Sequence, residues 1–117
     1  MNTFKKDPKQ ELLVNFFSAY FHEDWPCEAK TPEEVVTAYA KGTVSDEKIG
    51  ILCKAILEFS RRFDDEKELE EKLFSELGCY YTPSADGLSP KEWLKRVVSQ
   101  LVGLRGLRTD SFFDGGI

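Results

Sequence analysis

The chain has 117 residues, of which 41% are hydrophobic and 32% are charged, and it carries a formal net charge of −5. This length and composition predict one folded domain and exclude an intrinsically disordered chain. No apolar run reaches the roughly 20 residues that a membrane span needs, and the polar residues 1–10 lack a signal-peptide pattern, so we expect a cytoplasmic protein without a membrane partner.

The negative charge is concentrated in the middle of the chain. Residues 23–76 contain fifteen acidic side chains against eight lysines and arginines, a net charge of −7, whereas residues 1–22 and 77–117 each carry +1. An acidic segment repels nucleic acid, whose phosphates bind lysine and arginine clusters. It attracts a basic protein instead. A role in solubility alone is the competing interpretation.

The first predicted helix covers about residues 8–21. Asp7 supplies a capping side chain, and Pro8 suits the first helical turn. Apolar side chains recur at helical spacing at Leu12, Leu13, Phe16, Phe17 and Tyr20. The connection that follows, at about residues 23–30, contains Trp25-Pro26, and we expect it to be an aromatic loop that packs on the helices.

Two further helices are predicted at about residues 32–41 and 46–63. Thr31 and Glu34 match a capping box for the first of them, and Gly42 ends it. Ser45 begins the second with acidic residues after it. Their apolar positions follow helical spacing at Val35, Val36, Tyr39, Ala40, Ile49, Leu52, Cys53, Ile56, Phe59 and Phe63.

The last two helices are predicted at about residues 65–77 and 90–105. Asp64 or Asp65 begins the first of them, Gly78 ends it, and Ser89 caps the second. The first is expected to bury Leu69, Leu73, Phe74 and Leu77, and the second Trp93, Leu94, Val97, Val98, Leu101 and Leu104. Between them, residues 79–88 form a second aromatic loop with a turn at Asp86-Gly87.

These segments predict an all-α fold. No stretch shows the alternation of period two that is typical of strands. We therefore expect a single-domain bundle of about five helices around an aromatic-rich core, formed by about residues 8–105. For the tail, residues 106–117, the sequence leaves two alternatives: docking through Phe112-Phe113, or mobility.

The sequence offers few candidates for a catalytic or metal site. His22 beside Glu23 and Asp24 could be imagined as a general base, but adjacent side chains rarely aim at one point, and a lone histidine at a helix end is commonly a capping residue. The acids around Asp64 and Asp65 are explained by the first turn of a helix. No CxxC pair, metal-ligand spacing or flanking signature marks Cys27, Cys53 and Cys79. We therefore expect no enzyme, metal or cofactor.

Three segments carry a resemblance to a known family. They are Tyr20-Phe21-His22-Glu23-Asp24-Trp25, Gly78-Cys79-Tyr80-Tyr81, and Gly87-Leu88-Ser89 with Glu92-Trp93-Leu94. Over about residues 10–105 the chain resembles the small all-α immunity proteins of bacterial contact-dependent growth inhibition (CDI) systems. The resemblance implies a cytoplasmic protein that binds the cognate toxin C-terminal domain and neutralises it by occlusion. Such toxins are often nucleases with basic active sites, which an acidic protein would fit.

The resemblance implies no catalytic role for any residue. For His22, Asp24 and Trp25 it leaves two alternatives, a role in binding or a role in the fold, in which Trp25 is buried and Asp24 or His22 ties the following loop to it.

The partner-binding face is predicted from charge and aromatic side chains. The expected contact residues are Glu23, Asp24, Glu58, Asp64, Asp65, Glu66, Glu68, Glu70, Glu71, Tyr80 and Tyr81, the tyrosines serving as aromatic anchors. The alternative is a solvated helix face on which Glu68 pairs with Lys72. Two other functions stay open: an acidic adaptor or regulatory module that binds another basic protein, and a small hydrolase or metal protein that uses His22.

Overall fold

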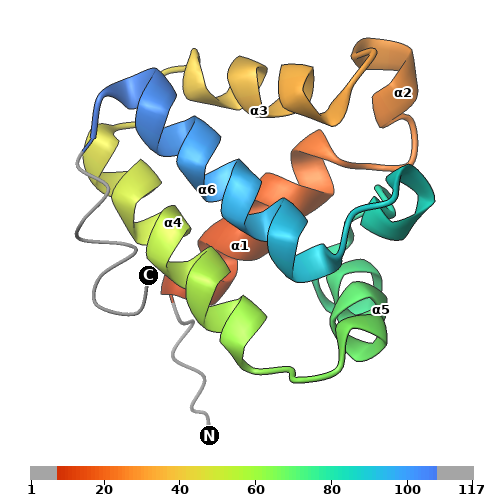
Figure 1. Cartoon of the computed structure of the whole chain (residues 1–117). Coiled ribbons are helices and arrows are strands. Elements are labelled where there is room, and N and C mark those ends of the chain that lie inside the picture. The colour runs from red at the N-terminus through yellow and green to blue at the C-terminus, as the bar shows by residue number, and fades with distance from the viewer. Residues whose placement is uncertain (1–7, 108–117) are drawn as a thin grey trace, which may run out of the picture.

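The computed structural model describes residues 8–107, which form six α-helices and one 3-10 helix and contain no strand (Figure 1). The α-helices are α1 (Pro8–Tyr20), α2 (Trp25–Glu28), α3 (Pro32–Ala40), α4 (Asp46–Arg61), α5 (Glu66–Leu77) and α6 (Pro90–Arg105). The 3-10 helix η1 covers Pro83–Asp86. The predicted all-α single-domain fold is confirmed, and the five predicted helices correspond to α1, α3, α4, α5 and α6.

The connection at residues 23–30, expected to be a loop, contains the additional helix α2. Pro26 occupies its first turn, where a missing backbone N–H costs nothing. The Ala29 N–H donates to the Trp25 carbonyl at 3.0 Å, and Ala29 then adopts an extended backbone that ends the helix. A proline compatible with a helix start was therefore mistaken for a loop residue.

Side-chain caps hold the starts of α3, α4 and α6 as predicted, whereas Asp7, the predicted cap of the first helix, lies outside the described residues. The hydroxyls of Thr31, Ser45 and Ser89 each accept the backbone N–H three residues later, at 3.0–3.2 Å. At α5 the cap is Asp65 rather than Asp64, and its carboxylate accepts a first-turn N–H at 3.0 Å. Each such cap stabilises the protein by about 1 kcal/mol.

Helices α1 and α6 organise the molecule, because each of them packs against α3, α4 and α5. In Figure 1, α6 crosses in front of α1, with α3 above and α4 beside it. Helix α5 lies at the opposite side of the molecule from the α3–α4 connection, next to η1. Helices α2, η1 and α5 therefore lie along one side of the molecule, although they are separated in the sequence (Figure 1).

An aromatic cluster joins the segments that carry the family resemblance. The ring centroid of Trp93 lies 5.3 Å from that of Phe21 and 4.8 Å from that of Tyr81. Phe17 adds a fourth ring at 6.0 Å from Trp93. Trp25 was expected to be buried but is only partly so, and its ring lies against the edge of the cluster, 5.8 Å from Tyr81. The three segments that carry the resemblance therefore meet at this cluster of aromatic rings.

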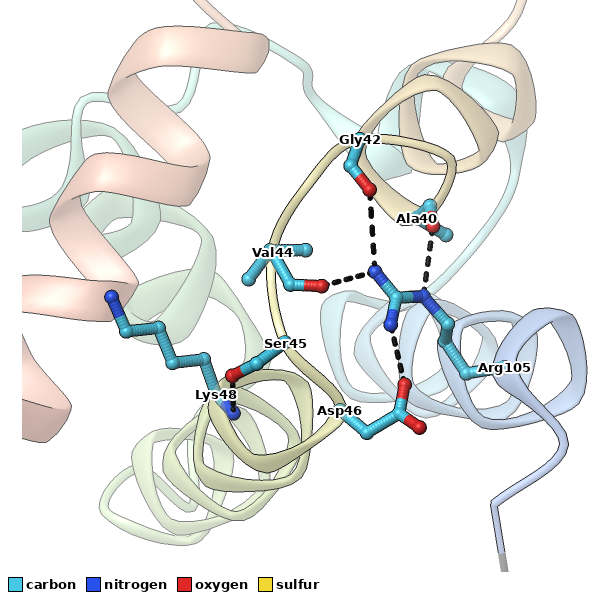
Figure 2. A network of polar contacts seen from close by, with 7 residues as sticks. All are labelled: Ala40, Gly42, Val44, Ser45, Asp46, Lys48 and Arg105. Atoms are coloured by element: carbon cyan, nitrogen blue, oxygen red, sulfur yellow. Dashed lines mark hydrogen bonds and ion pairs between the residues drawn. The ribbon is translucent and has the colours of Figure 1, made fainter.

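At the other end of α6, Arg105 fastens the α3–α4 connection to the helix bundle (Figure 2). Its Nε donates to the Ala40 carbonyl at 2.9 Å, and its Nη2 donates to the carbonyls of Gly42 and Val44. Its Nη1 forms an ion pair with the Asp46 carboxylate. The planar guanidinium thus satisfies three backbone carbonyls at the end of α3 and in the connection after it, which have no acceptor role inside a helix.

The structure describes the chain from Pro8 as far as Leu107, just after the C-terminal end of α6. Leu107 packs partly buried against the core. The alternatives for Phe112 and Phe113, and the assignment of the tail to the same domain, concern residues outside this range. Between residues 8 and 107, no helix has the length and apolar character needed to cross a membrane.

Candidate functional site

Helix α5 and the two residues before it form the most acidic part of the chain. Residues 64–77 contain seven carboxylates and two lysines, a net charge of −5. The helix buries Leu69, Leu73 and Leu77, which recur every four residues on one stripe. Because this stripe faces the core, the charged side chains of α5 are turned towards its exposed and half-exposed sides.

Three of these acids accept hydrogen bonds from backbone N–H groups. Besides Asp65, the cap of α5, Glu66 accepts the Lys91 N–H at 3.1 Å through Oε1. Glu70 accepts both the backbone N–H and the hydroxyl of Ser84, each at 2.9 Å. The latter two carboxylates bind the first turns of α6 and η1, where free backbone N–H groups favour negative charge. They therefore contribute to the fold as well as to the acidic surface.

Three further acids of this segment point to solvent, and the seventh, Glu76, is paired. Asp64, Glu68 and Glu71 are exposed, and none of them forms an ion pair within the part of the chain that the structure describes. The expected pairing of Glu68 with Lys72 is wrong. Lys72 turns towards Glu76 instead, at 4.0 Å, where Arg62 also contacts Glu76, at 3.7 Å.

A shallow hollow beside α5 collects four of the predicted partner-binding acids. It is lined by Asp65, Lys67, Glu68, Glu70, Glu71 and Thr82. Thr82 comes from the segment between α5 and η1. With four carboxylates against one ammonium group, the hollow presents concentrated negative charge to anything that enters it.

The other predicted acids do not join this hollow. Glu58 lines a different hollow together with Arg62 and Lys9, whose Nζ lies 3.1 Å from the Glu58 carboxylate. Glu23 and Asp24 are exposed on the connection between α1 and α2. The prediction therefore combined Glu58, which lines a different hollow, with acids that line the hollow beside α5.

The two tyrosines proposed as anchors differ in their environment. Tyr81 is 7% exposed, and its hydroxyl donates to Asp86 Oδ2 at 2.7 Å. Burial and the Asp86 carboxylate raise the pKa of Tyr81. As a buried core residue, Tyr81 is not available as an anchor, so that part of the prediction is corrected. Tyr80 is 46% exposed and remains a candidate.

Phe74 is the functional candidate that the sequence analysis missed. It was expected in the core, but 53% of it is exposed, and its ring contacts Tyr80 edge to face, with the centroids 5.0 Å apart. Helical geometry could have predicted this exposure. Leu69, Leu73 and Leu77 already fill the buried stripe of α5, and Phe74 lies about 100° around the helix axis from Leu73. The residue is thus an exposed aromatic beside the acids of α5.

A second groove adjoins this surface. It lies between α2, the start of α3 and η1, and is lined by Trp25, Pro26, Lys30, Thr31, Pro32, Glu33, Tyr80, Tyr81, Thr82, Ala85 and Asp86. Thr82 lines both this groove and the acidic hollow. The two depressions therefore form neighbouring parts of one surface, with Tyr80 at the rim of the groove.

His22 holds the turn after α1. Its Nδ1 accepts the Asp24 N–H at 3.0 Å, and its Nε2 lies 3.2 Å from Glu28 Oε2. Both ring nitrogens therefore bind atoms of residues 24–28, so His22, one of the two residues expected to tie the following loop to Trp25, contacts that loop before and after Trp25. With its two nitrogens occupied in this way, the ring has the surroundings of a structural residue.

The cysteines lie in different environments. Cys53 and Cys79 are buried, whereas Cys27 is exposed. Burial raises the pKa of each of the two buried thiols to about 12, so neither is a thiolate nucleophile near neutral pH. Over residues 8–107, no group of three histidine, cysteine or acidic side chains is placed to hold a metal ion.

The sequence of this chain matches a known protein family, and its fold matches a solved structure. The family model described as CdiI immunity protein matches residues 9–101. A chain in the crystal structure of a CdiA-CT/CdiI complex from Y. kristensenii 33638 superposes with a TM-score of 0.71 at 25% sequence identity, over 80% of this chain and 98% of that one. No curated protein matches the chain.

The family match runs from the second residue of α1 well into α6 and therefore covers the helices that build both the aromatic cluster and the acidic hollow. This chain belongs to the CdiI immunity protein family, whose members are toxin inhibitors and not enzymes.

Proposed function

We propose that this protein binds the toxin C-terminal domain of a CdiA-type protein and neutralises it by occluding its active site, and that the toxin is a nuclease. The observation that carries the proposal is the acidic α5 face, defined as Asp64, Asp65, Glu68, Glu70 and Glu71. The family and the similar chain in a CdiA-CT/CdiI complex support a toxin domain as the partner.

Electrostatics connects the α5 face with a nuclease. An enzyme that binds a polyanion needs lysine and arginine side chains around its cleft. A protein surface with grouped carboxylates offers the same sign of charge as the substrate and is attracted to the same cleft. Because screening limits each charge to about 8 Å at physiological ionic strength, acids that share one hollow reinforce one another, whereas scattered acids do not.

The hydrogen bonds inside the α5 face favour tight binding. Asp65 caps α5, and Glu70 is held by Ser84. Their carboxylates are therefore positioned before any partner arrives, and less conformational entropy is lost when the complex forms. Glu68 and Glu71 remain exposed and can turn towards cationic side chains of the toxin.

The proposed function places the protein in the cytoplasm. A nuclease toxin acts on nucleic acid there, so an inhibitor that covers its active site has to meet it in the same compartment.

A charge-reversal experiment tests the proposal. Glu68→Lys combined with Glu71→Lys removes exposed carboxylates that make no ion pair among residues 8–107. We expect the variant to associate with the toxin domain encoded beside the gene of this chain at least about ten times more slowly at low salt, since charge mainly controls the rate of encounter. The dependence of that rate on ionic strength should also weaken.

The matched control is Glu11→Lys combined with Glu47→Lys, which changes the net charge by the same amount at exposed positions on α1 and α4. It should keep the wild-type association rate to within about twofold, because distant exposed charges are screened. Co-expression of the wild-type protein with the toxin domain should rescue growth and preserve cellular RNA and DNA. The proposal would be contradicted if growth were rescued while cellular nucleic acid was still degraded. It would also be contradicted if the two double variants associated with the toxin domain at equal rates.

A further inference from the structure

We propose that Phe74 and Tyr80 together form the apolar anchor of the toxin-binding face, and that the toxin meets them with an apolar pocket inside a basic surface. This inference rests on the function proposed above. It adds to that function the two residues that supply binding energy, as distinct from the acids that guide the encounter.

The exposure of the pair is the first observation. Within residues 8–107, the exposed large hydrophobic side chains are Phe74 at 53%, Tyr80 at 46% and Leu104 at 46%. Leu104 was expected to be buried, but it lies in the last turn of α6 and is exposed as a single apolar residue, which is an ordinary feature of a protein surface. Phe74 and Tyr80, however, come from different segments and contact each other edge to face at 5.0 Å between ring centroids, which makes one aromatic surface.

The backbone holds these two rings in place. The Tyr80 N–H donates to the Phe21 carbonyl at 2.8 Å, and Gly78 turns the chain after α5 with a φ of 69°. The Cys79 N–H also returns to the Leu73 carbonyl at 3.1 Å. Since the N–H groups of Cys79 and Tyr80 are both hydrogen-bonded, the backbone that carries Tyr80 is held before binding, and less conformational entropy is lost in a complex.

The surroundings of the pair have the character of an interface. Glu70 and Glu71 lie one helical turn before Phe74 and therefore on the same side of α5. On its other side, Tyr80 lines the groove that contains Trp25 and shares Thr82 with the acidic hollow. An aromatic centre with charged residues around it is the arrangement in which a few residues carry most of the binding energy.

The charge of this surface decides which occupant it fits. In a twofold dimer the same patch faces itself, so the segment at residues 64–77, with a net charge of −5, would meet its own carboxylates. Like charges placed opposite each other cost several kcal/mol. A basic partner instead neutralises the acids while its apolar pocket buries the two rings. The toxin domain, and not a second copy of this chain, is the occupant that satisfies both requirements.

The test measures binding of purified variants to the toxin domain encoded beside the gene of this chain, by calorimetry or surface-based kinetics. Phe74→Ala and Tyr80→Ala should each weaken the affinity by about 30-fold, and the double variant by more than about 100-fold, mainly through faster dissociation. The matched control is Leu104→Ala, which removes an equally exposed apolar side chain from the C-terminal turn of α6. It should bind within twofold of wild type.

The outcomes separate this inference from the proposed function. If the wild-type protein does not bind the toxin domain, both fail. If it binds and the Phe74 and Tyr80 variants bind equally well, only the anchor is wrong. Urea unfolding should show each variant folded under the binding conditions with only a modest loss of stability, since both side chains are half exposed, so a lost affinity reports on the interface. Dimerisation of the free protein that Phe74→Ala abolishes would overturn the choice of occupant.

Discussion

The hydroxyl of Tyr81 donates a hydrogen bond to Asp86 Oδ2 at 2.7 Å and thereby ties the end of η1 to the aromatic cluster. The same ring lies against Trp25 and Trp93, so one side chain joins three segments that are far apart in the sequence. Through this contact the aromatic core supports the groove that borders the proposed binding face.

Substitution of Tyr81 should separate the two parts of this interaction. Tyr81→Phe removes the hydrogen bond and keeps the ring, and it should lower the free energy of unfolding by about 1 kcal/mol, because the exposed Asp86 carboxylate regains water. Tyr81→Ala removes the ring as well and should cost about 3–5 kcal/mol. Chemical denaturation measures both values, and equal losses for the two variants would show that the ring contributes nothing.

Arg105 should be important for stability although it lies far from the acidic hollow. Arg105→Ala leaves the carbonyls of Ala40, Gly42 and Val44 without this donor and should lower the free energy of unfolding by about 2–3 kcal/mol. Arg105→Lys should recover less than half of that loss, because an ammonium group cannot reproduce the planar fork.

The control for Arg105 is Arg96→Ala, which breaks an exposed pair with Glu92 one turn away on α6. Its expected cost is about 0.3–0.5 kcal/mol. Equal unfolding midpoints for Arg105→Ala and Arg96→Ala would contradict the role drawn in Figure 2.

The turn at Gly78 should not tolerate a side chain. Its φ is +69°, and a Cβ there would lie 3.0 Å from Ser18 Cβ on α1. Gly87 has a similar φ of +78° with nothing within 4 Å of the same position. Gly87→Ala therefore reports the backbone cost alone, about 1–2 kcal/mol, and Gly78→Ala should cost distinctly more. Thermal unfolding of the two variants checks the difference, which vanishes if Ser18 can move freely.

Thiol chemistry should distinguish the three cysteines. Cys27 is exposed, whereas Cys53 and Cys79 are buried with pKa values raised to about 12. At neutral pH a disulfide reagent such as Ellman's reagent should therefore modify one thiol per native molecule quickly and three after denaturation. Cys27→Ala should remove the fast reaction. Rapid modification of more than one native thiol would show that the core opens readily.

The buried thiols should also make stability depend on alkaline pH. Burial raises the pKa of Cys53 and Cys79 to about 12, above the value of about 8.5 in an unfolded chain. The unfolded state thus loses its thiol protons first, and stability falls as the pH rises from about 8.5 towards 12. Urea titrations at several pH values should show a shallower decline for Cys53→Ala than for wild type, and parallel declines would contradict this.

Much of the helical structure could be predicted from local chemistry. The hydroxyls of Thr31, Ser45 and Ser89 accept hydrogen bonds from N–H groups only three residues away. Their capping role can therefore be predicted from the neighbouring sequence. Helix α2 escaped prediction because Trp25-Pro26 is compatible with both a loop and a helix start. A helix of four residues is also too short to show apolar side chains at helical spacing.

The candidate site was predictable in charge but not in geometry. The surplus of acids between residues 23 and 76 is a property of the sequence. Its distribution among surfaces is not: Glu58 is paired with Lys9 from another helix, and Glu70 is bound to Ser84 fourteen residues later. Such long-range partners follow from packing, which no local pattern reports.

The sequence by itself determined an acidic all-α protein with capped helices, because charge is a sum over residues and caps act within one turn. Only the tertiary structure decided that Tyr81 enters the core while its neighbour Tyr80 and Phe74 stay at the surface. The reason is geometric: burial depends on which helices pack against a side chain, and α1, α5 and α6 meet through contacts between residues far apart in the chain.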